Sequence, residues 1–498
     1  MAQRALQTSE VYKADLHLLT VGRVGYNILM ILDNKSFFLL GIKGAAMANI
    51  AVMLTQMDKQ VSGVDFEEEF ITDKSLTENN ITYSTDFGDL KSVQEYDIFV
   101  YSAAHGGKDN ILAQEALRKG KEIVSQPALI GELLAQFPRS LAVAGCHGKT
   151  TTSSLLAWSL TQLGKDPSFL IGAPPFDGGG GGKMTESEFF VVEADEYGVH
   201  PPKDKTPKLL FLRPNYTLCM NIDFDHPDVY ENIGMTKKTF MKFFSQSKHL
   251  VLCGDDPIIQ SLLLSLANRS PITYGTGKKN TYFAQDIIYN QDSTEFSVYK
   301  KDVHIGTCKT ELFGAKNVLN SLGVVALLLE NGFLFEEIAQ SLLGFKGAKR
   351  RMELAWTDKN SYLFDDYGHH PAELEATIQA LKSRFPEKKL HVLFQPHTFS
   401  RTLALKKDFA RVLAAAQAAY IGPIFPSARE NTDQFKVSSF DVAKEAKSEH
   451  VKAFDTMQGV LDSLASKFRS GDVVLTIGAG DIYKLKSGII EIINEATT

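Results

Sequence analysis

The strongest constraint on this chain is an apolar strand that leads directly into a glycine-bracketed lysine. Residues 141–152 read Leu-Ala-Val-Ala-Gly-Cys-His-Gly-Lys-Thr-Thr-Thr. The two glycines allow a tight turn whose N–H groups converge on an anion, and the lysine and the hydroxyl after it suit a phosphate and Mg²⁺. A helix that we expect to begin near Thr151 directs its positive end at the same anion. The segment therefore predicts a phosphate-binding loop.

This loop is a contracted form of the common eight-residue P-loop, which would require a glycine at Val143. We expect the nucleotide to be held by Gly145, Cys146, His147, Gly148, Lys149, Thr150 and Thr151. An ordinary strand-to-helix turn is the alternative. Phosphate binding is favoured because a strand precedes the glycines and a helix follows them.

Chain length and composition point to a globular protein of several domains. A chain of 498 residues is long enough for about three domains of typical size. Hydrophobic residues make up 44% and charged residues 22%, which is ordinary for a soluble globular protein. The net charge of -6 gives no basic excess, so we expect no nucleic-acid partner. The sequence sets no oligomeric state.

Cysteine usage and hydropathy favour a cytoplasmic protein. The cysteines are scattered without a CxxC spacing, at Cys146, Cys219, Cys253 and Cys308, so we expect reduced thiols. The most apolar early stretch, residues 26–32, is too short to cross a bilayer and shows no cleavage-site pattern. We predict neither a signal peptide nor a membrane span.

Short β-rich runs alternate with amphipathic helices in three series, which begin at Lys35, Leu141 and Tyr362. Such alternation is typical of parallel sheets covered by helices, so we predict three α/β units in a row. A helix is expected through residues 47–57. The expected strands are residues 37–40, 61–64, 98–101, 189–192, 217–221, 391–394 and 473–477.

Domain boundaries are expected where this pattern lapses, near Pro138 and near residues 344–347. A run of five glycines at 178–182 is expected to form an irregular, mobile loop near the nucleotide, with a plain flexible turn as the alternative. The expected division is an N-terminal extension of unknown role at 1–34 and domains at 35–138, 139–345 and 346–498.

Two polar segments follow predicted strands and place ligand groups beside the phosphate loop. The acidic residues 193–196 come directly after one strand, where hard oxygen ligands suit Mg²⁺. Asp223 and His226 follow the next strand, and the histidine is a candidate ligand for metal or phosphate. A solvated acidic loop and a purely structural Asp–His pair are the alternatives.

Together these motifs resemble the ATP-binding centre of the Mur ligases. The resemblance covers residue 36 to about residue 490, with its motifs in order at 41–47, 61–65, 145–152, 192–196, 221–226, 345–351 and 365–371. It implies an α/β, three-domain Mur ligase architecture. The implied domains are a Rossmann-like N-terminal domain that binds a UDP-sugar, a P-loop ATPase-like central domain that binds ATP, and a Rossmann-like C-terminal domain that receives an amino acid.

The resemblance implies roles for individual residues. The implied catalytic residues are Lys149, Glu193, His226 and His369, and the implied Mg²⁺ ligands are Thr150, Glu193 and His226. Asn317 and Arg351 are implied to join the loop in binding the nucleotide. The implied substrate contacts are Gly41, Gly44, Asp65 and Ser102 in the N-terminal domain and Asp366, Tyr367, His369 and Arg401 in the C-terminal domain.

The chain departs from the family pattern at several positions. Lys43 stands in place of a glycine, where it could contact a phosphate itself. Thr398 stands where some members have arginine, which leaves Arg401 as the charge for the amino acid's carboxylate. Further replacements are Ala46 for a glycine, Cys146 for a threonine and Lys316 for a histidine.

Within the family, residues 394–402, 426–431 and 475–481 are most similar to members that attach L-alanine to UDP-N-acetylmuramate in peptidoglycan synthesis. The implied reaction begins with attack of the sugar's carboxylate on the γ-phosphate of ATP and proceeds through an acyl phosphate. Residues 349–354 and 210–230 are also similar to a recycling ligase that attaches the tripeptide L-alanyl-γ-D-glutamyl-meso-diaminopimelate to this sugar. The alanine reaction is favoured because the C-terminal domain carries the closer match.

Other hypotheses stay open at this point. Residues 41–44 before Asp65 suggest a nucleotide-dependent oxidoreductase, although the full GxGxxG pattern is missing. A non-catalytic nucleotide-binding regulatory protein on the same fold is a further alternative. His369 either positions the amine or takes its proton, for which a pKa near 6.5 is suitable, or the histidines at 369–370 only cap a helix.

Overall fold

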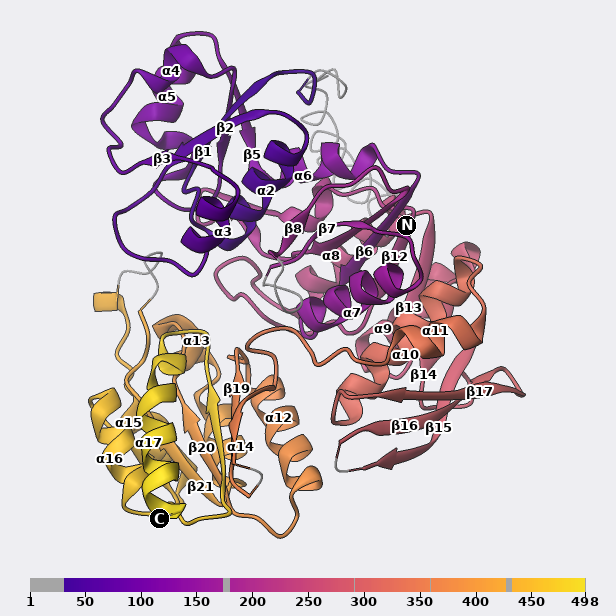
Figure 1. Ribbon diagram of the computed structural model, residues 1–498, viewed down its shortest axis with the longest axis vertical. Helices are drawn as coiled ribbons and strands as arrows, with labels where there is room; N and C mark the ends of the chain where they lie inside the picture. The colour runs from indigo at the N-terminus through magenta and orange to yellow at the C-terminus, as the bar shows by residue number, and fades with distance from the viewer. Residues whose placement is uncertain (1–30, 173–179, 291, 359, 427–431, 498) are drawn as a thin grey trace, which may run out of the picture.

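The computed structural model describes residues 31–172, 180–290, 292–358, 360–426 and 432–497. They form three α/β domains in order along the chain, each built on its own main sheet (Figure 1). The predicted α/β class with three successive units is confirmed. Within the described ranges, no helix combines the length and apolar character that a bilayer crossing requires. The predicted extension at 1–34 lies almost entirely outside the described residues.

The N-terminal domain is a five-stranded parallel sheet in the order β3-β2-β1-β4-β5. Its central strand β1 (Ser36–Leu40) is apolar and buried along its whole length, as expected for a parallel sheet covered on both faces. The other strands are β2 (Gln60–Val64), β3 (Tyr83–Ser84), β4 (Ile98–Tyr101) and β5 (Glu122–Ser125). The helices are α2 (Ala45–Gln56), α3 (Asp73–Glu78), α4 (Ser92–Glu95), α5 (Ile111–Arg118) and α6 (Gln126–Ala135).

The middle domain has a ten-stranded mixed sheet in the order β17-β16-β15-β14-β13-β12-β6-β9-β7-β8. Its strands are β6 (Arg139–Ala144), β7 (Ser168–Leu170), β8 (Gly182–Lys183), β9 (Phe189–Ala194), β12 (Tyr216–Cys219), β13 (His249–Cys253), β14 (Ile272–Gly275), β15 (Tyr282–Tyr289), β16 (Thr294–Lys300) and β17 (Val303–Thr310). Its helices are α7 (Lys149–Gln162), α8 (Ile233–Gln246), α9 (Pro257–Leu263), α10 (Ala315–Glu330) and α11 (Phe335–Ser341), and β10 (Gly198–His200) pairs with β11 (Asp204–Pro207) in a separate hairpin.

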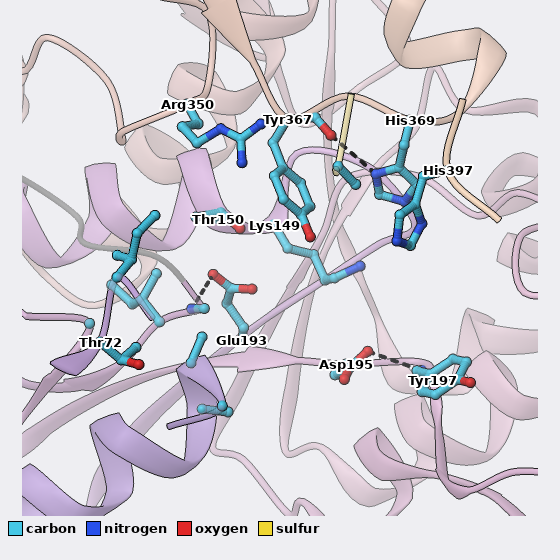
Figure 2. Close-up of a pocket in the computed structure, with 18 of the residues that line it drawn as sticks. Thr72, Lys149, Thr150, Glu193, Asp195, Tyr197, Arg350, Tyr367, His369 and His397 are labelled. Atoms are coloured by element: carbon cyan, nitrogen blue, oxygen red, sulfur yellow. Dashed lines mark hydrogen bonds between the residues drawn. The ribbon is translucent and has the colours of Figure 1, made fainter. Parts of the chain in front are cut away.

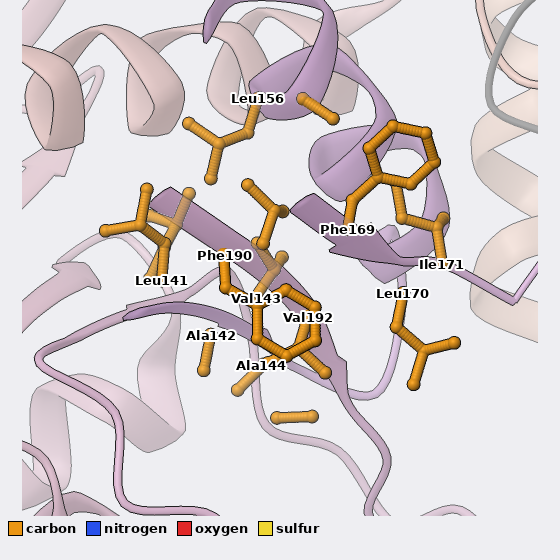
Figure 3. Close-up of a cluster of buried hydrophobic side chains, with 14 of the residues drawn as sticks. Leu141, Ala142, Val143, Ala144, Leu156, Phe169, Leu170, Ile171, Phe190 and Val192 are labelled. Carbon is orange, nitrogen blue, oxygen red and sulfur yellow. The ribbon is translucent and has the colours of Figure 1, made fainter. Parts of the chain in front are cut away.

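The phosphate loop is mounted on the buried centre of this sheet. Strands β6 and β9 run parallel, with Leu141 opposite Val191 and Val143 opposite Glu193. Their apolar side chains pack with Leu156 of α7 in the cluster shown in Figure 3. Because β6 and β9 end side by side, the loop after β6 and the acidic residues at the end of β9 emerge at the same edge.

The glycine run is more regular than the sequence predicts. Residues 173–179 lie outside the described residues, but Gly182 begins β8, so the expectation that no part of the run holds regular structure is wrong. A Cβ atom at Gly182 would lie 2.4 Å from the backbone oxygen of Asn49 in α2. Close packing between two domains therefore explains this glycine.

The C-terminal domain has a six-stranded sheet in the order β18-β19-β23-β20-β21-β22, parallel except for the edge strand β18. The strands are β18 (Glu353–Thr357), β19 (Tyr362–Asp366), β20 (Leu390–Phe394), β21 (Ala418–Ile421), β22 (Val451–Ala453) and β23 (Val473–Ile477). The helices are α12 (Pro371–Arg384), α13 (Phe399–Ala404), α14 (Lys406–Ala414), α15 (Ser439–Ala446), α16 (Met457–Ala465) and α17 (Lys486–Thr497). Residues 427–431, part of one predicted motif, lie outside the described residues.

The middle domain joins its two neighbours differently. One continuous hydrophobic cluster contains residues of both the N-terminal and the middle domain. Among the described residues, the two clusters of the C-terminal domain contain only that domain's own side chains. The C-terminal domain is therefore a separate packing unit.

Candidate active site

A cavity of about 1540 Å³ lies where the three domains meet, and all three contribute to its walls. Figure 2 shows Lys149, Thr150 and Glu193 of the middle domain with Tyr367 and His369 of the C-terminal domain around it. The sequence-predicted residues that line it are Gly44, Lys149, Thr150, Glu193, His226, Arg351, Tyr367, His369 and Arg401. The fold thus brings together candidate residues that are widely separated in the sequence.

The phosphate loop has the backbone geometry that its glycines predict. Gly148 is the residue before α7 and has φ 85°, a left-handed conformation that glycine adopts without strain. The helix begins at Lys149, two residues before the predicted start near Thr151. Its first N–H groups are therefore directed at the mouth of the loop, where an anion would be stabilised.

Lys149 is held in place by its own loop and by a carboxylate. Its Nζ atom donates to the carbonyl oxygen of Gly145 at 2.7 Å and to Glu196 Oε2 at 2.7 Å. Burial alone would lower the pKa of Lys149, but the carboxylates of Glu196 and Asp195 raise it. The lysine is consequently a fixed positive charge at the cavity.

Glu193 and Thr150 form an oxygen-rich corner of the cavity. Glu193 Oε1 accepts a hydrogen bond from the N–H of Gly172 at 3.0 Å, and burial raises the pKa of this carboxyl group. Arg351 of the C-terminal domain donates from Nη2 to Thr150 Oγ1 at 3.2 Å. A partly buried carboxylate beside a hydroxyl is a donor set that fits Mg²⁺.

His226 lies in the loop after β12, beside Glu196. Its Nε2 atom is 3.4 Å from Glu196 Oε1, and its ring packs edge-on against Tyr197. Burial by itself lowers the pKa of His226, but Asp225 and Glu196 outweigh that effect and raise it. Glu196, Asp225 and His226 offer ligand atoms within 4.8 Å of one another. Asp225 had no predicted role, and Glu196 was predicted only as part of the acidic segment 193–196.

Arg401 reaches from the C-terminal domain to a carboxylate of the middle domain. Its Nη2 atom donates to Asp225 Oδ1 at 2.9 Å and its Nε atom to the same oxygen at 3.3 Å. Burial opposes the charges of both groups, yet Asp225 raises the pKa of Arg401, and His226 together with Arg401 lowers the pKa of Asp225. This pair was not predicted, because its members come from different domains.

His147 links the phosphate loop to the C-terminal domain. Its Nε2 atom is 3.2 Å from Asp223 Oδ2, and its Nδ1 atom is 3.3 Å from Glu373 Oε1 in the first turn of α12. Burial would lower the pKa of His147, but these two carboxylates raise it to about 9. His147 is not among the residues that line the cavity, so its predicted contact with the nucleotide stays a prediction.

The two adjacent histidines of the C-terminal domain have different roles. His370 is the N-cap of α12 and forms a capping box with Glu373, as one of the two alternatives predicted. His369 lines the cavity, and burial together with Arg401 lowers its pKa to about 3. The expectation of a pKa near 6.5 is therefore wrong for His369, because this ring is desolvated and lies near a fixed cation.

Asp366 and Tyr367 precede these histidines. Asp366 is buried outside the cavity wall, where it accepts hydrogen bonds from the N–H groups of Met352 and Gly368, and burial raises its pKa to about 6. Tyr367 lines the cavity, and the Arg351 guanidinium lies 5.0 Å from its ring centroid. Asp366 thus orients the loop that carries Tyr367 and His369.

The predicted UDP-sugar contacts are divided between the cavity and the layer behind it. Gly44 precedes α2 and lines the cavity, whereas Gly41 (φ 80°) and Ser102 do not. Asp65 accepts a hydrogen bond from the N–H of Lys43 at 2.7 Å and pairs with His105. It therefore orients the turn before α2.

Lys43 is committed to a local interaction. Its side chain is 2% exposed, donates to the backbone oxygen of Glu68 at 2.8 Å and pairs with Asp73 at 3.4 Å. These contacts tie the turn before α2 to the loop after β2. Lys43 also lines the cavity, so its contact with a phosphate stays a prediction.

Three further predicted nucleotide residues are buried or locally bonded near the loop. Thr151 is buried within α7, and Cys146 Sγ accepts a hydrogen bond from the N–H of Asp223 at 3.1 Å. Asn317 accepts a hydrogen bond from Asn320, whose Oδ1 would lie 3.2 Å from a Cβ atom at Gly148. These residues pack against the phosphate loop and do not line the cavity.

Comparison with known sequences gives three consecutive domain matches. Residues 37–138 match the Mur ligase family, catalytic domain, residues 143–328 match the Mur ligase middle domain, and residues 350–480 match the Mur ligase, glutamate ligase domain. The chain is 36% identical over 458 residues to a UDP-N-acetylmuramate–L-alanine ligase of Ligilactobacillus salivarius. That alignment covers 91% of this chain and 96% of the relative.

Solved structures share the same fold. The UDP-N-acetylmuramate-alanine ligase MurC from Thermotoga maritima has a TM-score of 0.72 and 23% identity, over 92% of this chain and 99% of that one. A murein peptide ligase from Psychrobacter arcticus has a TM-score of 0.65 and 21% identity, over 92% of this chain and 98% of that one. The three matched domains occur in the order of the three sheets, and the resemblance predicted from the motifs is confirmed. This chain belongs to the Mur ligase family.

Proposed function

We propose that this protein is an ATP-dependent ligase that joins L-alanine to the carboxylate of UDP-N-acetylmuramate. The observation that carries the proposal is the shared cavity: the start of α2, the phosphate loop and the loop with His369 all open into it. An activated acid can therefore meet an amine without crossing bulk water. We assign the UDP-sugar to the domain at 35–138, the nucleotide to 139–345 and the amino acid to 346–498.

In the first step, a carboxylate oxygen of the sugar attacks the γ-phosphorus of ATP, and the bond to the β-γ bridging oxygen breaks. ADP leaves, and an acyl phosphate remains. Lys149 neutralises charge on the transferred phosphoryl group, and Arg351 closes over Thr150 from the C-terminal domain. Mg²⁺, held by Thr150, Glu193 and His226, would supply further neutralisation of the phosphate charge.

In the second step, the neutral amine of L-alanine attacks the acyl carbon, and phosphate leaves from the tetrahedral intermediate. Arg401 binds the carboxylate of the amino acid, and His369 lies beside it. His369 is neutral, so it can accept a hydrogen bond from the amine. The bound carboxylate also offsets the Arg401 charge that depresses the pKa of His369, which makes the ring a better base when the amine is present.

Two features support the remaining assignments. Relatives named as L-alanine ligases align with this chain over nearly their whole length, and we therefore favour alanine over the tripeptide as amine donor. We place the enzyme in the cytoplasm, because ATP is available there and the four cysteines are all free and buried.

The proposal is tested by incubating the full chain with ATP, UDP-N-acetylmuramate and either L-alanine or the tripeptide, and by measuring phosphate release and product mass. We expect turnover with L-alanine. Phosphate release with the tripeptide alone would reverse the choice of amine.

The variant Lys149→Ala distinguishes a catalyst from a regulatory nucleotide-binding protein. We expect kcat to fall by about 10³-fold, because removal of a charge that stabilises the transition state typically has effects of this order. Lys165→Ala is the matched control, since Lys165 is an exposed lysine just beyond the other end of α7. Equal turnover in wild type and Lys149→Ala would contradict catalysis at this loop.

A further inference from the structure

We propose that Asp225 of the middle domain is a positioning residue for the amine substrate. It holds the Arg401 guanidinium at the angle from which that group receives the α-carboxylate of the amino acid. The inference rests on the proposed function, in which Arg401 is the carboxylate-binding cation. It adds to that function that residues of two domains together form the amino-acid site.

The hydrogen bonds between Asp225 and Arg401 leave one edge of the guanidinium available. Asp225 Oδ1 accepts from Nη2 at 2.9 Å and from Nε at 3.3 Å. Among the described residues, Nη1 has no hydrogen-bond partner, and Arg401 lines the cavity. A guanidinium is planar with five N–H donors, so fixing one edge also fixes the direction of the other.

Asp225 is itself held rigidly. Its Oδ1 atom also accepts the backbone N–H of His226 at 2.7 Å, and the side chain is 4% exposed. Arg401 is 6% exposed, so the pair is shielded from solvent and weakly screened. A second arginine is absent at position 398: Thr398 is the N-cap of α13, and its hydroxyl accepts the N–H of Arg401. Arg401 therefore depends on Asp225 for its orientation.

The pair also places the amino-acid site beside the nucleotide side of the cavity. Asp225 precedes His226, and His369 interacts electrostatically with both Asp225 and Arg401. Arg401 is thus oriented for the amine only when the C-terminal domain is closed against the middle domain. An amino acid that arrives before closure meets a flexible arginine and binds weakly.

The test measures recognition of the carboxylate separately from amide formation. The full-length enzyme is assayed with ATP, UDP-N-acetylmuramate and either L-alanine or L-alaninamide, which keeps the amine but lacks the carboxylate. The variants are Asp225→Asn, Asp225→Glu, Arg401→Lys and the double variant Asp225→Asn/Arg401→Lys. Glu231→Gln is the matched control, because Glu231 is an exposed carboxylate in the same loop and is not among the residues that line the cavity.

We expect Asp225→Asn to lower the ratio of kcat/KM for L-alanine to that for L-alaninamide by about tenfold, with the KM for ATP unchanged within about twofold. Arg401→Lys should lower the ratio similarly, and the double variant should fall no further than the lower single variant. Asp225→Glu should restore part of the ratio, and Glu231→Gln should retain the wild-type ratio.

Two results would overturn the proposal. If Asp225→Asn lowers kcat/KM equally for both amines, or raises the KM for ATP instead, Asp225 serves the nucleotide or a metal and does not position Arg401. If the losses in the double variant multiply, the two residues act independently. Failure of the proposed function itself gives a different result, because the wild-type chain then forms no alanine amide, which overturns both proposals.

Discussion

The two junctions of the middle domain differ in chemistry. Toward the N-terminal domain, the hydrophobic core continues without a break, and β8 packs so closely on α2 that only glycine fits at position 182. Toward the C-terminal domain, the contacts that cross the junction include the pairs His147–Glu373 and Arg401–Asp225. An apolar junction gains stability from continuous packing, whereas paired polar groups can exchange partners with substrate or water at little net cost.

The junction with the C-terminal domain is the one suited to move. The C-terminal domain has its own hydrophobic clusters and can separate from the middle domain without exposing a shared core. The side chains that it presents to the cavity, such as Arg351 and Arg401, are the same ones that would contact nucleotide and amino acid. Closure and substrate binding therefore use one set of groups.

The largest effect is expected when the polar junction loses an arginine that reaches the phosphate loop. Arg351→Ala removes the contact to Thr150. We expect kcat/KM to fall by about 10³-fold, or about 4 kcal/mol, while the melting temperature changes little. Steady-state kinetics and calorimetry check both expectations.

A second arginine at the same junction provides the control. The Arg384 guanidinium lies 3.6 Å from the ring centroid of Phe313 in the middle domain but is not among the cavity residues. Arg384→Ala should change kcat/KM by less than about threefold, because the contacts that it removes are made to aromatic rings outside the cavity. Equal losses in the two variants would mean that general weakening of the junction, and not the contact to the loop, limits catalysis.

At the apolar junction we expect a smaller effect, and it is an effect on stability and not on catalysis. Gly182→Val would place side-chain atoms against the backbone of Asn49, where a Cβ atom already lies 2.4 Å from oxygen. We expect the free energy of unfolding to fall by about 3 kcal/mol, as overpacking typically causes. Chemical denaturation followed by circular dichroism measures it.

Gly120→Ala is the matched control for that prediction. Gly120 has φ 73°, and no atom lies within 4 Å of an added Cβ, so only backbone strain of about 1 kcal/mol is expected. If Gly182→Val is no more destabilising than Gly120→Ala, the N-terminal junction is looser than its packing indicates.

The smallest effect concerns the pH dependence of the polar junction. Asp223 of the same domain and Glu373 across the junction raise the pKa of His147 from 6.5 to about 9. Only the pairing with Glu373 depends on closure, and its stabilisation of the closed arrangement is complete below pH 6.5 and is lost as pH rises through about 9. We expect this loss to weaken the junction by about 1–2 kcal/mol. Small-angle X-ray scattering should show a larger radius of gyration at pH 10 than at pH 7.

His147→Gln separates this titration from that of other groups. The glutamine cannot gain or lose a proton, so the variant should show a smaller expansion than the wild type over the same pH range. An expansion of equal size in both proteins would assign the effect to lysines and tyrosines elsewhere.

Local sequence patterns predicted much of the fold and the part of the site that lies on the middle domain. The strands at 98–101 and 473–477 have the predicted bounds, because buried parallel strands give continuous apolar runs. Lys149 and Glu193 reach one edge because β6 and β9 end side by side. Adjacent strands with polar ends are visible in a sequence pattern.

The unpredicted contacts all depend on tertiary structure. The partner of Lys149 is Glu196, and no local pattern distinguishes it from Glu193. The partner of Arg401 lies 176 residues earlier in the chain, so the pair exists only once two domains meet. Burial beside Arg401 also lowers the pKa of His369, which a reference value cannot reveal.

An isotope measurement shows whether the phosphate loop activates the sugar's carboxylate by phosphorylation. UDP-N-acetylmuramate labelled with ¹⁸O in its carboxylate is turned over with ATP and L-alanine, and the released phosphate is analysed by mass spectrometry. An acyl phosphate predicts ADP as the nucleotide product and one carboxylate oxygen transferred to each phosphate. Unlabelled phosphate, or labelled AMP with release of pyrophosphate, would rule out an acyl phosphate intermediate.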